Sequence, residues 1–159
     1  MIASAKIVEL DQLPARVAAL RAGGKKIVAT NGCFDLLHVG HVRYLQAARG
    51  PGELLVVGIN GDASTRKLKG DGRPVNNERD RAEVVAALAC VDLVTIFPEV
   101  RAVRFLELAK PDIYVKGGDY TVDTLEKSER LALEKADAEI RIIRFEEGYS
   151  TSGLLEKLK

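Results

Sequence analysis

Two histidines stand three residues apart in the segment NGCFDLLHVGH, residues 31–41, and the chain has no other histidine. An apolar run precedes this segment, so the pair lies where a strand turns into a helix. At a helix start, side chains at positions i and i+3 point the same way, and the free backbone amides attract anions. His38 and His41 are therefore predicted to hold one phosphate of a nucleotide, with Gly40 letting the backbone come close.

Two other interpretations of the histidine pair stay open. The side chains could make only local hydrogen bonds at the helix start, or they could be part of a zinc site. A zinc site needs further ligands, and no third histidine exists to supply one. The sequence also lacks a GxxxxGK[ST] loop and a GxGxxG turn, which argues against a P-loop ATPase and a dinucleotide-binding site. Cys33 and Cys90 lack metal-type spacing and are predicted to be free thiols.

Apolar runs alternate with helical periodicity along the chain, which is typical of repeated strand–helix units. We expect an α/β fold, a Rossmann-like doubly wound parallel sheet of five strands in the order 3-2-1-4-5 with helices on both faces. The expected strands are 25–30, 54–59, 93–97, 113–116 and 139–145. The expected helices run from 10 to the glycines at 23–24, from about 39, over 78–89, 102–109 and 125–135, and from 151. Residues 1–159 form one domain in this interpretation, with 1–24 as a helical extension packed on it.

Residues 61–77 are polar and contain glycine, and they join a strand to a helix where two to six residues usually suffice. The segment carries Arg66, Lys67, Lys69 and Arg73. It is predicted to be either a mobile basic flap that closes over a polyanion or a solvated surface loop.

The unusual residues follow the strands of the expected sheet, and ligands of such sheets bind outside the carboxyl ends of the strands. Residues 31–41 follow the first strand, 60–62 the second, 116–119 the fourth and 147–152 the fifth. With the first and fourth strands adjacent, the histidine turn and the turn at 116–119 should face each other across one crevice. Four separate turns are thus predicted to converge on one site.

The charge balance restricts the possible partners. The chain has 24 basic and 23 acidic side chains and a formal net charge of +1, which argues against bulk nucleic acid or a membrane surface as a partner. No apolar stretch approaches the length needed to cross a bilayer, and the first nine residues lack the pattern of a signal peptide. A cytoplasmic protein is expected.

The segment 31–41 resembles the HxGH signature of the cytidylyltransferase-like nucleotidyltransferases. Three further blocks are similar to the adenylyltransferase module of ADP-heptose synthases: NGDASTRKLKG at 60–70 with RPVN at 73–76, VKGGDY at 115–120, and FEEGYSTS at 145–152. The blocks agree in order and spacing from Val8 to the C-terminus. Arg144 lies one residue farther from the EG pair than the arginine of some cytidylyltransferase relatives, so no role is assigned to it.

The resemblance implies an enzyme that transfers AMP from ATP to D-glycero-D-manno-heptose 1-phosphate, giving ADP-heptose and pyrophosphate for lipopolysaccharide core or a related glycan. A separate heptose kinase and a phosphatase would then supply the substrate. Mg²⁺ would be bound mainly through the ATP phosphates, with no metal ligands assigned in the protein. A homodimer or higher homo-oligomer is expected.

Roles for individual residues follow from the motifs and the resemblance together. His38 and His41 would bind the triphosphate, and Lys69 and Arg81 would approach the departing pyrophosphate. The expected nucleotide-binding residues are Asn31, Gly32, Cys33, Phe34, Asp35, Gly40, Lys116, Gly117, Asp119, Glu147, Gly148, Ser150, Thr151 and Ser152. The expected substrate-binding residues are Asn60, Asp62, Lys67 and Arg73. For Asp35 and for the hydroxyls at 150–152, helix capping is the alternative role, and for Phe34 it is packing under the loop.

Two other functions stay open at this point. One is a cytidylyltransferase acting on glycerol phosphate or another alcohol phosphate. The other is a module that senses a nucleotide without turning it over.

Overall fold

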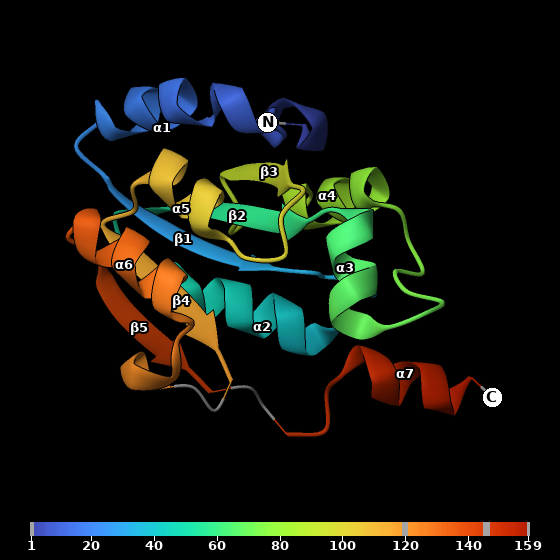
Figure 1. The fold of residues 1–159 in the computed structure, drawn as a ribbon. Coiled ribbons are helices and arrows are strands. Elements are labelled where there is room, and N and C mark those ends of the chain that lie inside the picture. Colours follow the sequence, from blue (N-terminus) through green and yellow to red (C-terminus); the bar gives the residue numbers. More distant parts are fainter. Residues whose placement is uncertain (1, 119–120, 145–146, 159) are drawn as a thin grey trace.

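Five parallel strands form one sheet in the order β3-β2-β1-β4-β5, as predicted (Figure 1). The computed structural model describes residues 2–118, 121–144 and 147–158. The strands are β1 Lys26–Gly32, β2 Glu53–Asn60, β3 Leu93–Phe97, β4 Ile113–Gly117 and β5 Glu139–Ile143. β1 lies between β2 and β4, so the strand order reverses at the carboxyl end of β1. This is the edge at which the sequence predicts a ligand.

Helices cover both faces of the sheet, which confirms the predicted fold class (Figure 1). The helices are α1 Leu13–Arg21, α2 Val39–Ala48, α3 Asp62–Lys69, α4 Glu78–Ala86, α5 Val103–Ala109, α6 Lys127–Lys135 and α7 Thr151–Lys157. Single turns of 3₁₀-helix occur at Ala3–Lys6, Leu10–Gln12 and Val122–Thr124.

Alternate side chains of the strands enter two separate hydrophobic cores. On one face, Ile27 and Ala29 of β1 pack with buried side chains of α1, α5 and α6. On the other face, Val28 packs with buried side chains of α2 and α4. Strand β2 is buried along its whole length, as expected for a strand covered on both sides. Packing on both faces fixes the strand ends that carry the site.

The chain before β1 contacts the same sheet. The backbone amide of Val8 donates to the carbonyl of Val94 in β3, at 2.9 Å. Leu13 and Val17 of α1 are buried in the core with α5 and α6. The expected helix from residue 10 begins as a 3₁₀ turn, and α1 itself starts next to Pro14, whose fixed φ suits the first helical turn.

The expectation of a loop throughout residues 61–77 is wrong, because residues 62–69 form α3. This helix has no apolar stripe: its buried side chains are Ser64 and Thr65, while Leu68 is 46% exposed. The two hydroxyls donate to the carbonyls of Gly61 and Asn60, so the buried face is satisfied by hydrogen bonds. A search for the helical periodicity of apolar residues therefore does not detect α3. Gly70, with φ of +95°, ends the helix.

Other boundaries differ by a few residues. The helix expected over 78–89 ends at Ala86, and β1 extends to Gly32 rather than ending at Thr30. The last strand ends at Ile143, and residue 145 lies outside the described residues. Among the described helices, none has the length and apolar character required to span a membrane.

Candidate active site

The strands β1 and β4 are neighbours, as the predicted strand order requires. β1 pairs with β4 through Val28 and Ala29. Near the site, the hydroxyl of Tyr114 on β4 donates to Oδ1 of Asn31, at 2.7 Å. The hydroxyl of Tyr44 on α2 donates to the carbonyl of Val115, at 3.2 Å. These bonds fasten the start of the histidine turn and α2 to β4. Sequence reasoning missed both tyrosines, because each reads as an ordinary core aromatic.

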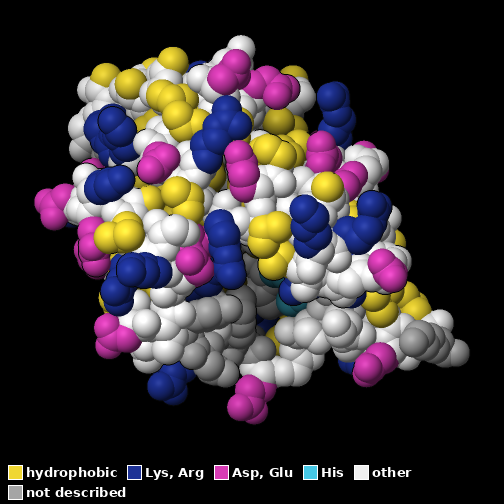
Figure 2. All heavy atoms as spheres, viewed as in Figure 1, with side chains coloured by type: hydrophobic (Ala, Val, Ile, Leu, Met, Phe, Trp, Pro, Cys, Tyr) yellow, Lys and Arg dark blue, Asp and Glu magenta, His cyan; other side chains and the backbone are white. Residues whose placement is uncertain are grey.

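His38 is the N-cap residue of α2, and His41 lies in the first turn of the helix. Their rings are stacked, with centroids 3.8 Å apart, and the ring of Phe34 lies 5.3 Å from that of His41. Phe34 is buried beneath the turn and lies in close contact with Gly32. Figure 2 shows a hollow on this face in which histidine atoms are visible, with Lys and Arg side chains nearby. The imidazoles thus lie where the sequence predicts a phosphate site.

The hydrogen bonds of the pair indicate where its protons are. The backbone amide of His38 donates to Nδ1 of His41, at 3.4 Å. A neutral imidazole with an accepting Nδ1 carries its proton on Nε2, so His41 offers an Nε2–H donor. Nδ1 of His38 is buried and has no hydrogen-bond partner in the described part of the chain.

Both imidazoles are held neutral. Burial, then the neighbouring His38, then Lys69 lower the pKa of His41 to about 4, from the usual 6.5. Burial also lowers the pKa of His38. The effect of Lys69 shows that the last turn of α3 brings its ammonium group within electrostatic range of the histidine pair. The site therefore combines neutral imidazoles with the positive charge of Lys69, which suits a polyphosphate.

The lowered pKa of His41 predicts a pH dependence of stability. The folded protein keeps His41 neutral, whereas the unfolded chain binds a proton near pH 6.5, so the free energy of unfolding should fall as the pH drops from 6.5 towards about 4. Urea unfolding between about pH 7 and about pH 4.5 measures this slope. The variant His41→Gln, which cannot take up the proton, should show a smaller slope. An equal slope in both proteins would contradict the assignment.

The C-terminal segment closes over Gly40. A Cβ atom at Gly40 would lie 2.9 Å from Cβ of Tyr149 and 3.0 Å from the His38 ring. The guanidinium of Arg43 lies 5.5 Å from the centroid of the Tyr149 ring, in a cation–π contact, and Thr151 Oγ1 donates to the carbonyl of Leu36. Gly40 is thus required for close packing on Tyr149 and His38, a contact that sequence reasoning did not foresee.

Adding a methyl group at position 40 should disturb the histidine pair. We expect Gly40→Ala to lower kcat about 10-fold by displacing the His38 ring, and to cost about 1–3 kcal/mol of unfolding free energy through overpacking. The double variant Gly40→Ala/Tyr149→Gly removes one of the two clashes and should recover part of the stability. Steady-state kinetics and thermal unfolding measure both effects. Full activity in Gly40→Ala would show that the packing at this position is irrelevant.

The remaining residues predicted at 147–152 have mixed placements. Ser150 Oγ accepts from the amide of Gly153 and caps α7, which is the alternative role stated above. Glu147 and Ser152 are exposed, and Gly148 has φ of +88°. On β4, Gly117 is buried and Lys116 is half-buried at the end of the strand. Asp119 lies outside the described residues.

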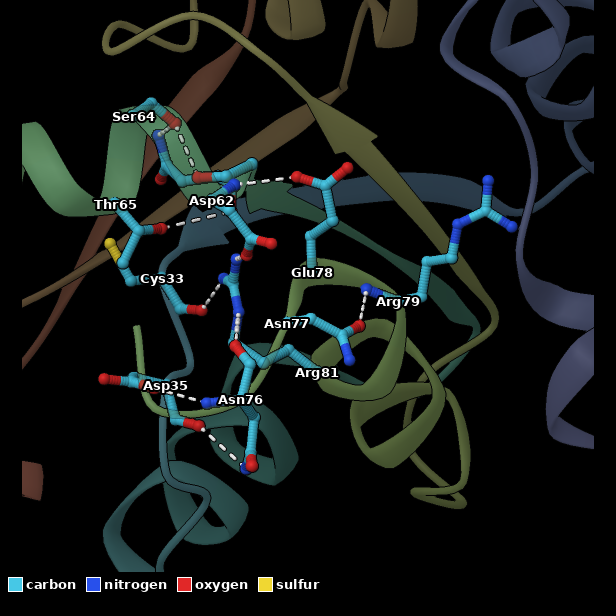
Figure 3. A network of polar contacts seen from close by, with 12 residues as sticks. Cys33, Asp35, Asp62, Ser64, Thr65, Asn76, Asn77, Glu78, Arg79 and Arg81 are labelled. Carbon is cyan, nitrogen blue, oxygen red and sulfur yellow. Dashed lines mark hydrogen bonds and ion pairs between the residues drawn. The ribbon is translucent and has the colours of Figure 1, made fainter. Parts of the chain in front are cut away.

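Two arginines that the sequence assigns to the site, Arg73 and Arg81, have partners within the protein. The guanidinium of Arg81 is 0% exposed and donates to the carbonyls of Cys33 and Asn76 and to Oδ1 of Asp62 (Figure 3). The expected direct contact of Arg81 with pyrophosphate does not fit this geometry, because the group is fully enclosed. Arg73 pairs with Asp35 in the same region.

Two more expectations change in the same way. The amide of Asn60 is buried and donates to the carbonyls of Glu99 and Val100, so it braces the connection after β3 rather than facing a substrate. The amide of Asp62 at the start of α3 donates to Oε2 of Glu78, at 2.7 Å (Figure 3). A carboxylate thus occupies the amino-terminal end of α3, and Glu78 is a residue that sequence reasoning missed. The phosphate site predicted at the start of α2 stays a prediction.

Comparison with known proteins identifies the family. The model of the cytidylyltransferase-like family matches residues 29–156. The chain belongs to this family. It is also 49% identical over 153 residues to the bifunctional protein HldE of Citrifermentans bemidjiense, and 50% identical over 155 residues to that of Geotalea uraniireducens. These alignments cover 96% and 98% of this chain but 31% of each relative, so the chain spans about a third of their length.

Solved structures agree with the cytidylyltransferase-like fold. The lipopolysaccharide core biosynthesis protein of Thermoplasma volcanium superposes with a TM-score of 0.62 at 27% identity, covering 79% of this chain and 98% of that one. A pantoate-beta-alanine ligase of Francisella tularensis superposes with a TM-score of 0.59 at 14% identity, covering 96% and 69% of the two chains, which shows a shared fold only. The predicted family membership is confirmed.

Within this cytidylyltransferase-like chain, the structure brings together the histidine turn, the end of β4, the last turn of α3 and the segment around Tyr149. It directs the polar groups of Asn60, Asp62, Arg73 and Arg81 at other protein atoms. Lys67 is exposed on α3.

Proposed function

We propose that this chain transfers AMP from ATP to D-glycero-D-manno-heptose 1-phosphate and releases pyrophosphate. The observation that carries the proposal is the stacked, neutral pair of His38 and His41 at the start of α2, with the Lys69 ammonium in electrostatic range. The similarity to HldE proteins over nearly the whole chain supports a sugar phosphate as the acceptor.

The reaction needs positioning and charge neutralisation more than acid–base chemistry. The attacking sugar phosphate is already ionised at neutral pH, so its oxygen displaces pyrophosphate directly at the α-phosphorus, in line and without a covalent enzyme intermediate. His41 donates through Nε2–H to phosphate oxygens as their negative charge grows, and His38 acts beside it. Lys69 neutralises charge on the departing pyrophosphate.

The residues present fit Mg²⁺ bound mainly through the ATP phosphates. The oxygens of Asp35 and Asp62 accept from arginine side chains, and the groups facing the site are imidazoles and an ammonium, which do not favour this ion. When bound, Mg²⁺ would add charge neutralisation between phosphate oxygens.

The other assignments follow from position at the same edge of the sheet. We assign Lys116 and Gly117, at the end of β4, and the segment from Glu147 to Ser152 to nucleotide contacts. Lys67 stays a candidate contact for the sugar phosphate, and Asp119 stays a prediction. The 1-phosphate substrate has to be supplied by a kinase and a phosphatase, and we place the reaction in the cytoplasm, where ATP is available. Homo-oligomerisation stays a prediction, which sedimentation analysis can test.

One incubation tests this proposal. The protein is mixed with Mg²⁺, one acceptor (either anomer of heptose 1-phosphate, or glycerol phosphate) and one of ATP, CTP, GTP or UTP, and the products are detected by mass. The expected result is ADP-heptose and pyrophosphate with ATP. CDP-linked product from CTP and an alcohol phosphate would replace the proposal with the cytidylyltransferase alternative. Tight ATP binding without pyrophosphate release would indicate the sensing module.

A further inference from the structure

The carboxylate of Asp35 ties the histidine turn to the segment that follows α3. Its side chain is 2% exposed, and Oδ2 accepts from Nε of Arg73, whose side chain is 14% exposed. Oδ1 accepts from the amide of Val75 at 2.7 Å and from that of Asn76 at 3.4 Å. Each of these three bonds thus runs from the turn after β1 to residues 73–76.

Arg81 forms a second tie at the other end of α3. It joins the carbonyl of Cys33, in the same turn, to Oδ1 of Asp62, the first residue of α3. The helix is therefore attached at its first residue through Asp62, and four residues beyond its last residue through Arg73. Figure 3 shows the guanidinium of Arg81 between Cys33 and Asp62, and Asp35 of the same turn bonded to Asn76.

The helix held between these two ties carries Lys69, and the turn at 33–35 leads directly to His38. Gly70 and Gly72 both have positive φ and separate Lys69 from Arg73. The buried hydroxyls of Ser64 and Thr65 hold the first part of α3 through hydrogen bonds, whereas the residues of its last turn are exposed, so the position of that turn depends on the chain that follows it. An ion pair as buried as Asp35–Arg73 is little screened by water and keeps a defined geometry.

We infer that Arg73 is a positioning residue: through Asp35 it holds the last turn of α3 so that Lys69 stays within electrostatic range of the histidine pair, and it does not bind the sugar phosphate. The inference rests on the proposed function. A lysine at position 73 would keep the positive charge but lose the planar guanidinium that Asp35 binds, so Arg73→Lys should retain only part of the activity.

The test is a double-mutant cycle between Arg73→Ala and Lys69→Ala, read in two ways. The first readout is kcat/KM for ATP, with KM for heptose 1-phosphate measured alongside. The second is an NMR titration of the two histidines, which does not require turnover and therefore separates failure of this inference from failure of the proposed function. Arg79→Ala, an exposed arginine on α4, is the matched control, and thermal unfolding verifies the fold.

Arg73→Ala is expected to lower kcat/KM for ATP about 100-fold, and Arg73→Lys about 10-fold. In the Lys69→Ala background the Arg73→Ala change should have little further effect. The His41 pKa should rise in Arg73→Ala to the value found in Lys69→Ala, and Asp35→Asn should behave like Arg73→Ala. The inference is overturned if the decreases in kcat/KM of Arg73→Ala and Lys69→Ala multiply in the double variant. It is also overturned if the His41 pKa in Arg73→Ala stays at its wild-type value, or if Arg73→Ala raises only KM for heptose 1-phosphate.

Discussion

Replacing His41 by alanine is expected to lower kcat for nucleotidyl transfer about 10²–10³-fold while the chain stays folded. The imidazole is held neutral, with its Nδ1 accepting from the amide of His38, which leaves the ring proton on Nε2 as the donor to phosphate. A donor that is already oriented costs no reorganisation as charge develops, so its loss acts mainly on the transition state. Steady-state kinetics with pyrophosphate detection measure the change.

The controls separate a lost donor from lost packing. His41→Gln retains an N–H donor on a flexible side chain and should keep part of the activity that His41→Ala loses. Circular dichroism and thermal unfolding show whether α2 is intact in both variants. An unchanged kcat in His41→Ala would remove the histidine pair from the reaction and leave it as a helix cap.

The largest expected effect on stability is that of Arg81→Ala. Its guanidinium is 0% exposed and holds two backbone carbonyls and one carboxylate from three separate segments. Removal leaves a cavity and unsatisfied buried carbonyls, so the free energy of unfolding should fall by about 3–5 kcal/mol. Urea unfolding at neutral pH measures the loss.

A matched exposed pair supplies the control for this prediction. Arg104 is 54% exposed and lies 3.5 Å from Glu99. An exposed pair of this kind contributes less than about 1 kcal/mol, so Arg104→Ala should change stability only slightly. Equal losses in Arg81→Ala and Arg104→Ala would contradict the structural role assigned to Arg81.

The sheet and the histidine turn could be predicted because simple rules govern them. Apolar runs marked every strand, and the rule that ligands bind where strand order reverses placed residues 31–41 next to the end of β4. The HxGH spacing then located the two imidazoles. Each step depends on apolar burial or on topology, and both leave a pattern in the sequence.

The arginine contacts and α3 left no such pattern. α3 buries hydroxyl groups instead of apolar side chains, so the hydrophobicity pattern of the sequence does not reveal this helix. Two of the acceptors of Arg81 are backbone carbonyls, which every residue type provides, so nothing in the sequence marks them. A basic side chain near a phosphate site is assigned to the phosphate by default. The structure shows that Arg73 and Arg81 pair with carboxylates.

The most direct test of the central claim is a crystal structure of the protein with Mg²⁺ and α,β-methylene ATP, an analogue that resists transfer at the α-phosphorus. We predict that the triphosphate lies at the start of α2, with phosphate oxygens in hydrogen-bond distance of His38 and His41 and with Lys69 beside the β- and γ-phosphates. A triphosphate bound elsewhere, with the stacked imidazoles making no contact to it, would contradict the account.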